Sequence, residues 1–234
     1  IFESKNERML VSVIMSVRNA HKTLEKSINS ILDQTYSNYE LLILDDYSTD
    51  DTLQILNKFK DRKNIKIFQN EKNLGLTKSL NILIEKSSGT LIARQDADDY
   101  SHKERIEQQV KKLTNYNLDF VSCRAEVINS SKVIPSVSYY LPKKIIIKYK
   151  NPFIHGTLLI KKEQLIEVGG YNENFYYAQD YKLMTDLISK NKRFRIIKEP
   201  LYFLNMKGNI SEIYKKEQKY YSDCVKKGLN PINE

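Results

Sequence analysis

The sequence contains no tryptophan, only two cysteines and only three histidines in its 234 residues. Cys123 and Cys224 stand far apart and lack the close spacing of a metal-binding motif, so we expect free thiols in a reducing compartment. The histidines form no cluster in the sequence, and a zinc site built from His and Cys is not expected.

Long hydrophobic runs are also missing. No apolar stretch approaches the ~20 residues that a membrane-spanning helix needs, and the N-terminal stretch IFESKNERMLVS lacks the pattern of a signal peptide. Hydrophobic residues still make up 41% of the chain, which is enough for a packed core. We therefore expect one domain over residues 1–234 of a cytoplasmic protein.

Charge of one sign is in excess, because 38 Lys and Arg residues outnumber 29 Asp and Glu residues and give a net charge of +9. Such a balance favours anionic partners, which include nucleic acid, an anionic membrane surface and phosphorylated ligands. Charge alone does not choose among these three classes.

The first half of the chain alternates buried β-branched runs with amphipathic helical patterns. This rhythm is typical of a doubly wound, Rossmann-like and mostly parallel sheet flanked by helices. We expect strands at 10–17, 39–46, 64–70, 89–95 and 118–128. We expect helices at 21–35, from residue 49 or 50 to 59, at 76–86, and from a capping box of Ser101 and Glu104 to residue 113.

The second half is less regular. After the first part, about 10–125, we expect an irregular part at about 126–205 and a basic helical extension at 206–234. The patterns there predict a strand at 153–160, a short helix at 164–171, a helix at 178–191 and a strand at 194–204. No linker separates the parts, so one α/β domain remains the simplest interpretation.

Polar clusters follow three of the predicted strands, at residues 16–19, 45–48 and 96–99. In an open parallel sheet, ligands bind outside the carboxyl ends of the strands. The three clusters should therefore line one crevice.

Asp96, Asp98 and Asp99 place three carboxylates in four positions, where they repel one another. Hard cations such as Mg²⁺ or Mn²⁺ take carboxylate oxygens and often share them with substrate phosphates. The alternative is a solvated turn at a helix start. Asp45 and Asp46 can accept hydrogen bonds from a base or a ribose, or they can belong to a helix-capping segment.

Five motifs in order resemble the family 2 glycosyltransferases, which are inverting enzymes of the GT-A fold that use nucleotide-sugar donors. They are VSVIMSVRN, ELLILDDYSTDDT, NEKNLGLTKSLN, GTLIARQDADDYSHKERIEQQ, and HGTLLIKKEQLIEVGGYNE with QDYKL. The resemblance runs from about residue 10 to 205. It implies that the irregular second half binds the acceptor.

The resemblance implies a donor site made of the strand ends. The nucleotide would be held by six residues: Ser16, Asn19, Asp45, Asp46, Lys78 and Asp96. Of the acidic pair, Asp46 would lie near the base and Asp45 is the weaker candidate.

The resemblance also implies a metal and a base. Asp98 and Asp96 would ligate Mn²⁺ or Mg²⁺ bound to the donor diphosphate, and His155 would contact the metal or diphosphate. Asp180 would be the catalytic base that deprotonates the acceptor hydroxyl. Gln179 stands where the family has Glu, which puts acceptor contacts in doubt.

The leading hypothesis is a metal-dependent inverting glycosyltransferase of surface polysaccharide synthesis. It would move a sugar from a nucleotide-sugar donor to a glycan or lipid-linked acceptor. We expect the donor to be a UDP-sugar. The basic stretch 143–150 and the C-terminal helix would touch an anionic membrane, on the inner face of the cytoplasmic membrane.

Two alternatives stay open from the residues. Acids at strand ends with Mg²⁺ also serve phosphoryl or nucleotidyl transfer, although no P-loop pattern is present. A noncatalytic basic module would bind nucleic acid, but the sequence lacks a recognisable motif for it, so no nucleic-acid partner is expected.

Overall fold

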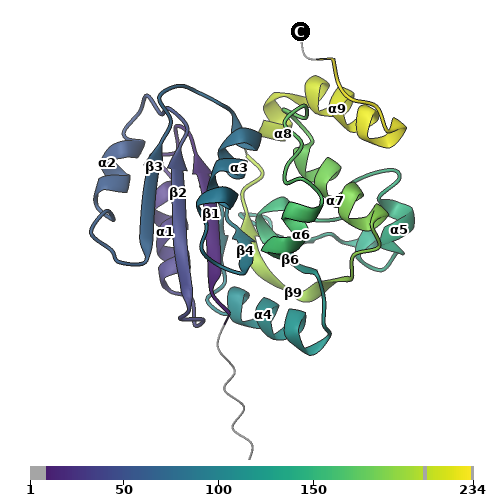
Figure 1. Cartoon of the computed structure of the whole chain (residues 1–234), viewed down its shortest axis with the longest axis horizontal. Coiled ribbons are helices and arrows are strands. Elements are labelled where there is room, and N and C mark those ends of the chain that lie inside the picture. Colours follow the sequence, from purple (N-terminus) through teal and green to yellow (C-terminus); the bar gives the residue numbers. More distant parts are fainter. Residues whose placement is uncertain (1–8, 208–209, 233–234) are drawn as a thin grey trace, which may run out of the picture.

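The computed structural model describes residues 9–207 and 210–232, which form a mixed sheet flanked by helices (Figure 1). The first half pairs four parallel strands in the order β3-β2-β1-β4. Its elements are β1 (Val11–Val17), α1 (Leu24–Leu32), β2 (Tyr39–Asp45), α2 (Thr52–Asn57), β3 (Ile65–Gln69), α3 (Leu76–Lys86) and β4 (Leu91–Arg94). The predicted Rossmann-like half is confirmed.

The parallel strands are buried on both faces because successive side chains point to opposite sides. Met15 of β1 packs in one core with Ile28 of α1. Ile14, next to it, packs in a second core with Leu80 of α3. Helices therefore cover both faces of this part of the sheet, which explains the uninterrupted apolar runs.

The second half completes the sheet to nine strands in the order β3-β2-β1-β4-β8-β6-β9-β5, with β7 paired to β6. The elements are β5 (Tyr100–Ser101), α4 (Arg105–Asn115), β6 (Phe120–Val127), β7 (Lys132–Ile134), α5 (Lys143–Ile146), β8 (Leu159–Lys161), α6 (Lys162–Glu167), α7 (Gln179–Ser189), β9 (Phe194–Leu204), α8 (Ile210–Ile213) and α9 (Lys215–Lys227). Short 3₁₀ turns occupy Val137–Tyr139 and His155–Thr157.

The short strand β8 is the junction of the two halves. It lies antiparallel between β4 and β6, so β6 runs in the same direction as β4 without touching it. The predicted strand at 153–160 is shorter than expected, because its first part turns as a 3₁₀ helix before β8 begins. One sheet thus runs through both halves, and it brings the turn at His155–Thr157 to the end of β4.

The capping box predicted from Ser101 and Glu104 is wrong. Ser101 belongs to β5 and pairs with Tyr202 of β9. Its hydroxyl donates to the Gln95 side chain at 2.7 Å, and α4 begins only at Arg105. Strand pairing with a distant segment uses the residues that would otherwise cap the helix.

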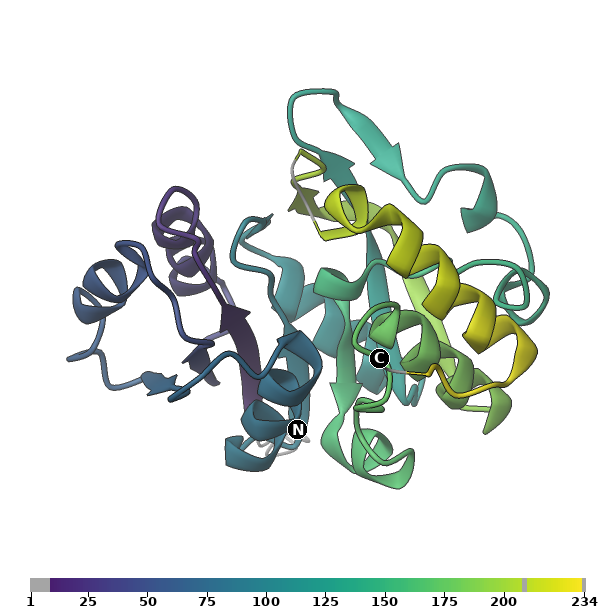
Figure 2. The same ribbon diagram turned by 90° about the horizontal axis from the view of Figure 1, so that it is seen from above.

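The C-terminal region forms two helices in place of the single predicted one. α8 and α9 are separated at Tyr214, and α9 packs on α7 with Cys224 and Val225 buried (Figure 2). Residues 208–209 and 233–234 of the predicted extension lie outside the described residues. No helix in the described part of the chain is long and apolar enough to cross a membrane.

The junction at β8 predicts a contrast between two isoleucines. Ile160 is fully buried and lies opposite Ile92 and Phe120, whereas Ile166 on α6 is 63% exposed. Ile160→Ala should lower the free energy of unfolding by about 2–5 kcal/mol, and Ile166→Ala by less than about 0.5 kcal/mol. Urea denaturation of both variants measures the difference. Equal losses would show that β8 does not hold the two halves together.

Candidate active site

The ends of β1, β2 and β4 lie side by side, as the sequence predicts. The Asp46 amide donates to the Val17 carbonyl at 2.8 Å, and the Gln95 amide donates to the Ile14 carbonyl at 3.2 Å. Asn19 joins the first two loops, since its side-chain oxygen accepts from the Thr49 amide at 2.8 Å. It adopts a left-handed conformation with φ of 50°, which Asn tolerates.

Asp46 anchors the loop before α3. One carboxylate oxygen accepts from the Asn70 side chain and the Leu74 amide, both at 2.8 Å. The other accepts from the Gly75 amide at 2.8 Å. Gly75 has a φ of +84°, and a Cβ there would lie 2.6 Å from the Tyr176 ring, so only glycine fits. Both oxygens of the Asp46 carboxylate therefore hold the loop before α3.

Asp45 has a different environment from its neighbour. It is fully buried, and its Oδ2 accepts from the Ser48 amide at 3.2 Å, while Oδ1 is buried with no hydrogen-bond partner. An unpaired buried oxygen is costly unless a ligand donates to it. Ser16 is partly exposed near the end of β1, and Lys78 is exposed on the first turn of α3.

A buried arginine ends β4. The guanidinium of Arg94 donates to the carbonyls of Ile14 at 3.1 Å and Gln95 at 2.8 Å, and it forms an ion pair with Asp96. Burial disfavours the charge of Arg94, but the Asp96 carboxylate outweighs this effect and raises the pKa of Arg94. One oxygen of Asp96 is therefore engaged by a permanent cation of the protein.

The second oxygen of Asp96 lies close to the backbone of the turn at His155–Thr157. A Cβ added to Gly156 would come within 2.7 Å of this oxygen and 2.2 Å of the Tyr202 hydroxyl. Glycine is therefore required where the late segment passes the acidic turn.

The other two carboxyls of the acidic turn contact Asn205, just after β9. The Asn205 side chain donates to Asp98 at 3.4 Å, and its backbone amide donates to Asp99 at 2.6 Å. Burial and the neighbouring Asp96 raise the pKa of Asp98 to about 6. Burial, Asp96 and Asp98 raise the pKa of Asp99 to about 8. The Arg94 charge lowers the pKa of Asp98 by less than burial and Asp96 raise it.

His155 connects the acidic turn to the Gly169, Gly170 and Tyr171 loop. Its Nε2 lies 2.7 Å from the Tyr171 hydroxyl and 3.3 Å from Nε of Arg94. Burial and the nearby Arg94 lower the pKa of His155 to about 4, so the ring is neutral at pH 7. Nε2 accepts from Arg94, so in this conformation it is not free to bind a metal.

Arg105 is fully buried at the start of α4. Its Nη1 donates to the Arg94 carbonyl at 2.9 Å and to the Gly156 carbonyl at 2.8 Å. Burial lowers the pKa of Arg105, and the guanidinium lies over the Tyr202 ring. The residue holds the end of β4 against the late segment.

Asp180, the predicted base, stands in the first turn of α7. It is partly exposed, and its Oδ2 accepts from the Asn151 side chain at 2.8 Å. The charge of Asp180 acts on both His155 and Tyr171. The base candidate therefore lies close to the same His155–Tyr171 pair on which Asp96 acts.

The acidic turn fits a metal only in part. No three His, Cys, Asp or Glu side chains converge on one point among the described residues. Mg²⁺ is often bound by one or two carboxylates together with substrate phosphates. Asp98 and the second oxygen of Asp96 supply such oxygens, and the raised pKa values of Asp98 and Asp99 describe a cluster that a cation would stabilise.

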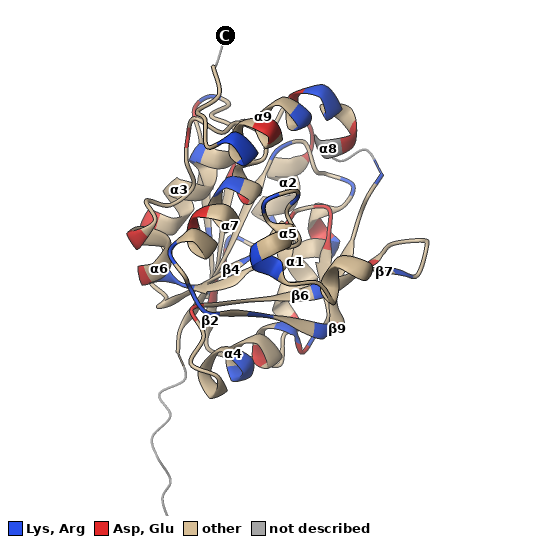
Figure 3. Ribbon diagram, turned by 90° about the vertical axis from the view of Figure 1, so that its right-hand side faces the viewer, with Lys and Arg blue, Asp and Glu red and all other residues tan. Residues whose placement is uncertain are grey.

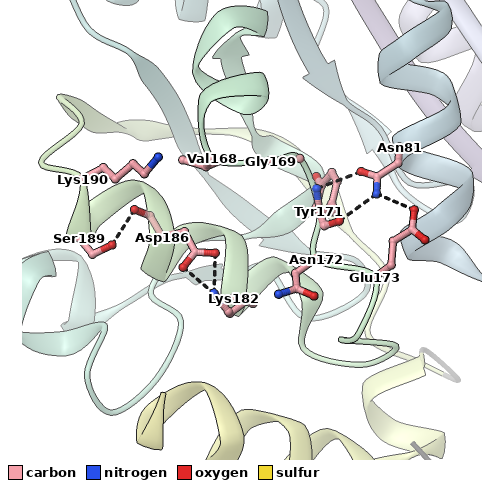
Figure 4. A pocket seen from close by; sticks show the side chains of 11 residues that line it. Asn81, Val168, Gly169, Tyr171, Asn172, Glu173, Lys182, Asp186, Ser189 and Lys190 are labelled. Carbon is pink, nitrogen blue, oxygen red and sulfur yellow. Dashed lines mark hydrogen bonds and ion pairs between the residues drawn. The ribbon is translucent and has the colours of Figure 1, made fainter. Parts of the chain in front are cut away.

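A hollow of about 560 Å³ lies beside the glycine loop, between α3 and α7 (Figure 4). Asn81 of α3 holds the backbone of Tyr171, and Lys182 pairs with Asp186 across its wall. None of the residues predicted for catalysis, nucleotide or metal lines this hollow.

Sequence reasoning missed three residues of the site: Arg94, Asn151 and Asn205. Arg94 gave a signal, since a charged residue that ends an apolar strand just before three acids must find a partner. Asn151 and Asn205 gave none, because only the fold brings them beside Asp180 and the acidic turn.

The acidic turn predicts that stability depends on pH. The folded protein keeps protons on Asp99 and Asp98 that the unfolded chain releases near its ordinary pKa. Without metal, the free energy of unfolding should therefore fall between about pH 4 and pH 8, by at most about 1.4 kcal/mol per pH unit for each proton.

Asp99→Asn should make this dependence weaker and stabilise the metal-free protein at about pH 8, because it removes the buried charge. Urea denaturation across this pH range measures the slope. Asp61→Asn, at an exposed position, is the control. Parallel curves for wild type and Asp99→Asn would contradict the raised pKa.

Comparison with known proteins places this geometry in a family. Residues 12–171 match the sequence profile described as Glycosyl transferase family 2. Solved structures share the fold: Staphylococcus aureus TarS 1–349 in complex with UDP-GlcNAc has a TM-score of 0.74 at 23% identity, over 86% of this chain and 60% of that one. The mannosyltransferase PcManGT of Pyrobaculum calidifontis, in complex with GDP-Man and Mn²⁺, has a TM-score of 0.74 at 18% identity, over 97% and 67%.

Curated relatives agree with the profile. The putative glycosyltransferase EpsE of Bacillus subtilis is 38% identical over 69% of this chain, which spans 59% of the length of EpsE. Two Escherichia coli proteins are each 32% identical. They are WfgD, a UDP-Glc:alpha-D-GlcNAc-diphosphoundecaprenol beta-1,3-glucosyltransferase, over 78% of this chain and 71% of WfgD, and the O-antigen biosynthesis glycosyltransferase WbnJ, over 94% and 87%. The chain belongs to glycosyl transferase family 2.

Proposed function

We propose that the protein is a metal-dependent inverting glycosyltransferase that moves a sugar from a UDP-linked donor to a lipid-linked glycan acceptor in surface polysaccharide synthesis. One observation carries the proposal. Asp96 of the acidic turn, which is suited to a metal–diphosphate group, and the partly exposed carboxylate of Asp180 both act on the buried pair of His155 and Tyr171, so the two functions lie close to the same pair. Inverting transfer needs a base and a leaving-group site close to one sugar, because the two act on opposite faces of its anomeric carbon.

The donor would occupy the ends of β1, β2 and β4. Oδ1 of Asp45 is buried without a hydrogen-bond partner, so it could accept a hydrogen bond from the nucleotide. Ser16 and Asn19 border the same crevice, Lys78 is available for phosphate, and Asp46 keeps the loop at Gly75 in place. WfgD is named as an enzyme that uses UDP-Glc, and TarS has been solved with UDP-GlcNAc. Both support a UDP-sugar.

Asp98 and Asp96 would hold Mn²⁺ or Mg²⁺, as the Mn²⁺ complex of the similarly folded PcManGT suggests. When bound, the metal would stabilise the charge that develops on the departing diphosphate. Arg94 keeps one Asp96 oxygen fixed, and Asn205 orients Asp98 from the other side. In this arrangement the neutral His155 supports Arg94, and its contact with the diphosphate stays a prediction.

Asp180 would accept the proton of the acceptor hydroxyl as that oxygen attacks the anomeric carbon. Asn151 orients the carboxylate through Oδ2 and leaves Oδ1 for the acceptor. Gln179 is buried at the start of α7, so it replaces the usual acid without adding charge beside the base.

The acceptor of WfgD is a sugar on diphosphoundecaprenol, a membrane lipid. We infer a lipid-linked acceptor of the same class here, and hence a protein that works on the cytoplasmic face of a membrane. The positive net charge fits this surface, and the proposal includes no nucleic-acid partner.

The donor site is tested by titrating UDP into the protein by calorimetry, with Mn²⁺ and then with excess chelator. Wild type should bind UDP only with metal. Asp98→Ala should weaken binding at least about tenfold, because it removes a carboxylate that the cation needs. Asp61→Asn, an exposed acid, should change nothing.

Each other result has a definite meaning. Binding of GDP or dTDP in place of UDP would keep the site and overturn the UDP donor. Binding of UDP that needs no metal would overturn the metal assignment. No nucleotide binding in either condition would overturn the donor site as a whole.

The catalytic base is tested by Asp180→Asn, which keeps the shape and the hydrogen bond to Asn151. UDP release from a UDP-sugar, with a GlcNAc-diphosphate-lipid acceptor, should fall by about 10²–10⁴-fold, while the affinity for UDP stays the same. Asp186→Asn, on the same helix but paired with Lys182, is the control. Activity of Asp180→Asn within about threefold of wild type would rule out this base.

A further inference from the structure

One continuous segment concentrates positive charge without any acid. Between Glu126 and Glu163 the chain contains seven lysines and no Asp or Glu. We call residues 137–150 the basic segment; it includes the turn at Val137–Tyr139 and α5. In Figure 3 the ribbon of α5, on the side of the molecule that faces the viewer, carries blue lysine positions. Local attraction for anions is therefore far stronger here than the net charge alone would indicate.

The lysines of the basic segment are available to an external partner. Lys144, Lys148 and Lys150 are exposed. None of them lies within ion-pair distance of a carboxylate in the described part of the chain. Their charges are not neutralised within the protein, so they can bind anionic groups outside it.

The same segment exposes apolar side chains between its lysines. Five of them are 41–72% exposed: Val137, Tyr140, Leu141, Ile145 and Tyr149. A soluble surface rarely gathers this many in one short segment. Lysines interleaved with tyrosine and aliphatic side chains match a membrane–water interface, where the cations meet lipid phosphates and the apolar groups enter the headgroup boundary.

The basic segment is attached to the helix that carries Asp180. The Tyr181 hydroxyl donates to the Ile147 carbonyl at 2.6 Å, and the Ile147 side chain is buried in the core beneath. Asn151, which follows the segment directly, donates to Asp180. A surface bound by this segment would therefore lie next to the site where the acceptor is deprotonated.

The C-terminal helix α9, also basic, differs in charge pattern. Its lysines alternate with Glu217 and Asp223, and Lys226 pairs with Asp223 at 2.9 Å. Its inner face, with Cys224 and Val225, is buried on the protein. α9 therefore presents mixed charge, and the structure distinguishes two segments that look alike by composition.

We propose that the basic segment 137–150 is the surface by which the protein docks on a bilayer containing anionic phospholipid, with Lys144 and Lys148 on the phosphates and Tyr140 and Ile145 in the interface. The proposal rests on the proposed function in one respect: a lipid-linked acceptor then approaches Asp180 from the docked face. A base close to the bilayer is needed because the lipid part of such an acceptor stays in the membrane.

The test is cosedimentation of the full chain with vesicles of phosphatidylcholine, with and without phosphatidylglycerol. Wild type should bind only the anionic vesicles, and salt should weaken binding. Lys144→Glu with Lys148→Glu should weaken it at least about 25-fold, as each lysine near an anionic surface contributes about a fivefold factor. Tyr140→Ser with Ile145→Ser should also weaken it. Lys215→Glu with Lys219→Glu, the same charge change at exposed positions of α9, is the matched control and should keep most binding.

Calorimetry with UDP and Mn²⁺ on each variant separates docking from the donor site. The proposal is supported if the Lys144→Glu with Lys148→Glu variant loses vesicle binding but keeps the UDP affinity of wild type. If wild type itself does not bind UDP, that result counts against the donor site alone. The docking surface is overturned if wild type binds neutral and anionic vesicles equally, or if it binds neither. It is also overturned if Lys215→Glu with Lys219→Glu weakens vesicle binding as much as Lys144→Glu with Lys148→Glu. A different result would be that wild type self-associates and binds no vesicles, and that Tyr140→Ser with Ile145→Ser abolishes the self-association. That result would assign the surface to a second copy of the chain and overturn membrane docking.

Discussion

The buried guanidinium of Arg94 is the interaction on which the site depends. A buried cation is costly unless several acceptors surround it, and Arg94 finds them on three separate segments. The carbonyl of Ile14 belongs to β1, the Asp96 carboxylate to the acidic turn, and His155 to the late segment that precedes β8. One side chain thus fixes the relative positions of the first and second halves of the sheet.

The position of β8 makes this arrangement possible. A chain that simply continued the parallel alternation would place β6 beside β4 and leave the late segment elsewhere. Instead β8 lies antiparallel between them and brings Gly156 against Asp96, and Arg105 donates to the carbonyls of Arg94 at the end of β4 and of Gly156 in the turn before β8. The irregular half therefore lies against the end of β4, and it carries Asp180 on α7 and the basic segment attached to that helix.

Neighbouring residues in the sequence have separate tasks in the fold. Asp45 and Asp46 look equivalent as a pair, yet both oxygens of Asp46 accept hydrogen bonds from the protein while Asp45 keeps an unpaired oxygen. Asp96 is paired with arginine, whereas Asp98 and Asp99 are left to repel each other. Such differences arise from contacts between segments distant in the chain, which no local pattern describes.

The sequence by itself determined the parallel half, the helix faces and the acidic cluster at a strand end, because hydrophobic periodicity and strand direction act over short stretches. The order and spacing of its motifs also indicated the family. Only the tertiary structure decided that Ser101 pairs in a strand, that His155 is neutral beside Arg94, and that Asn151 meets Asp180. These outcomes depend on long-range pairing and burial, whose energies exceed local preference and leave no periodic trace in the sequence.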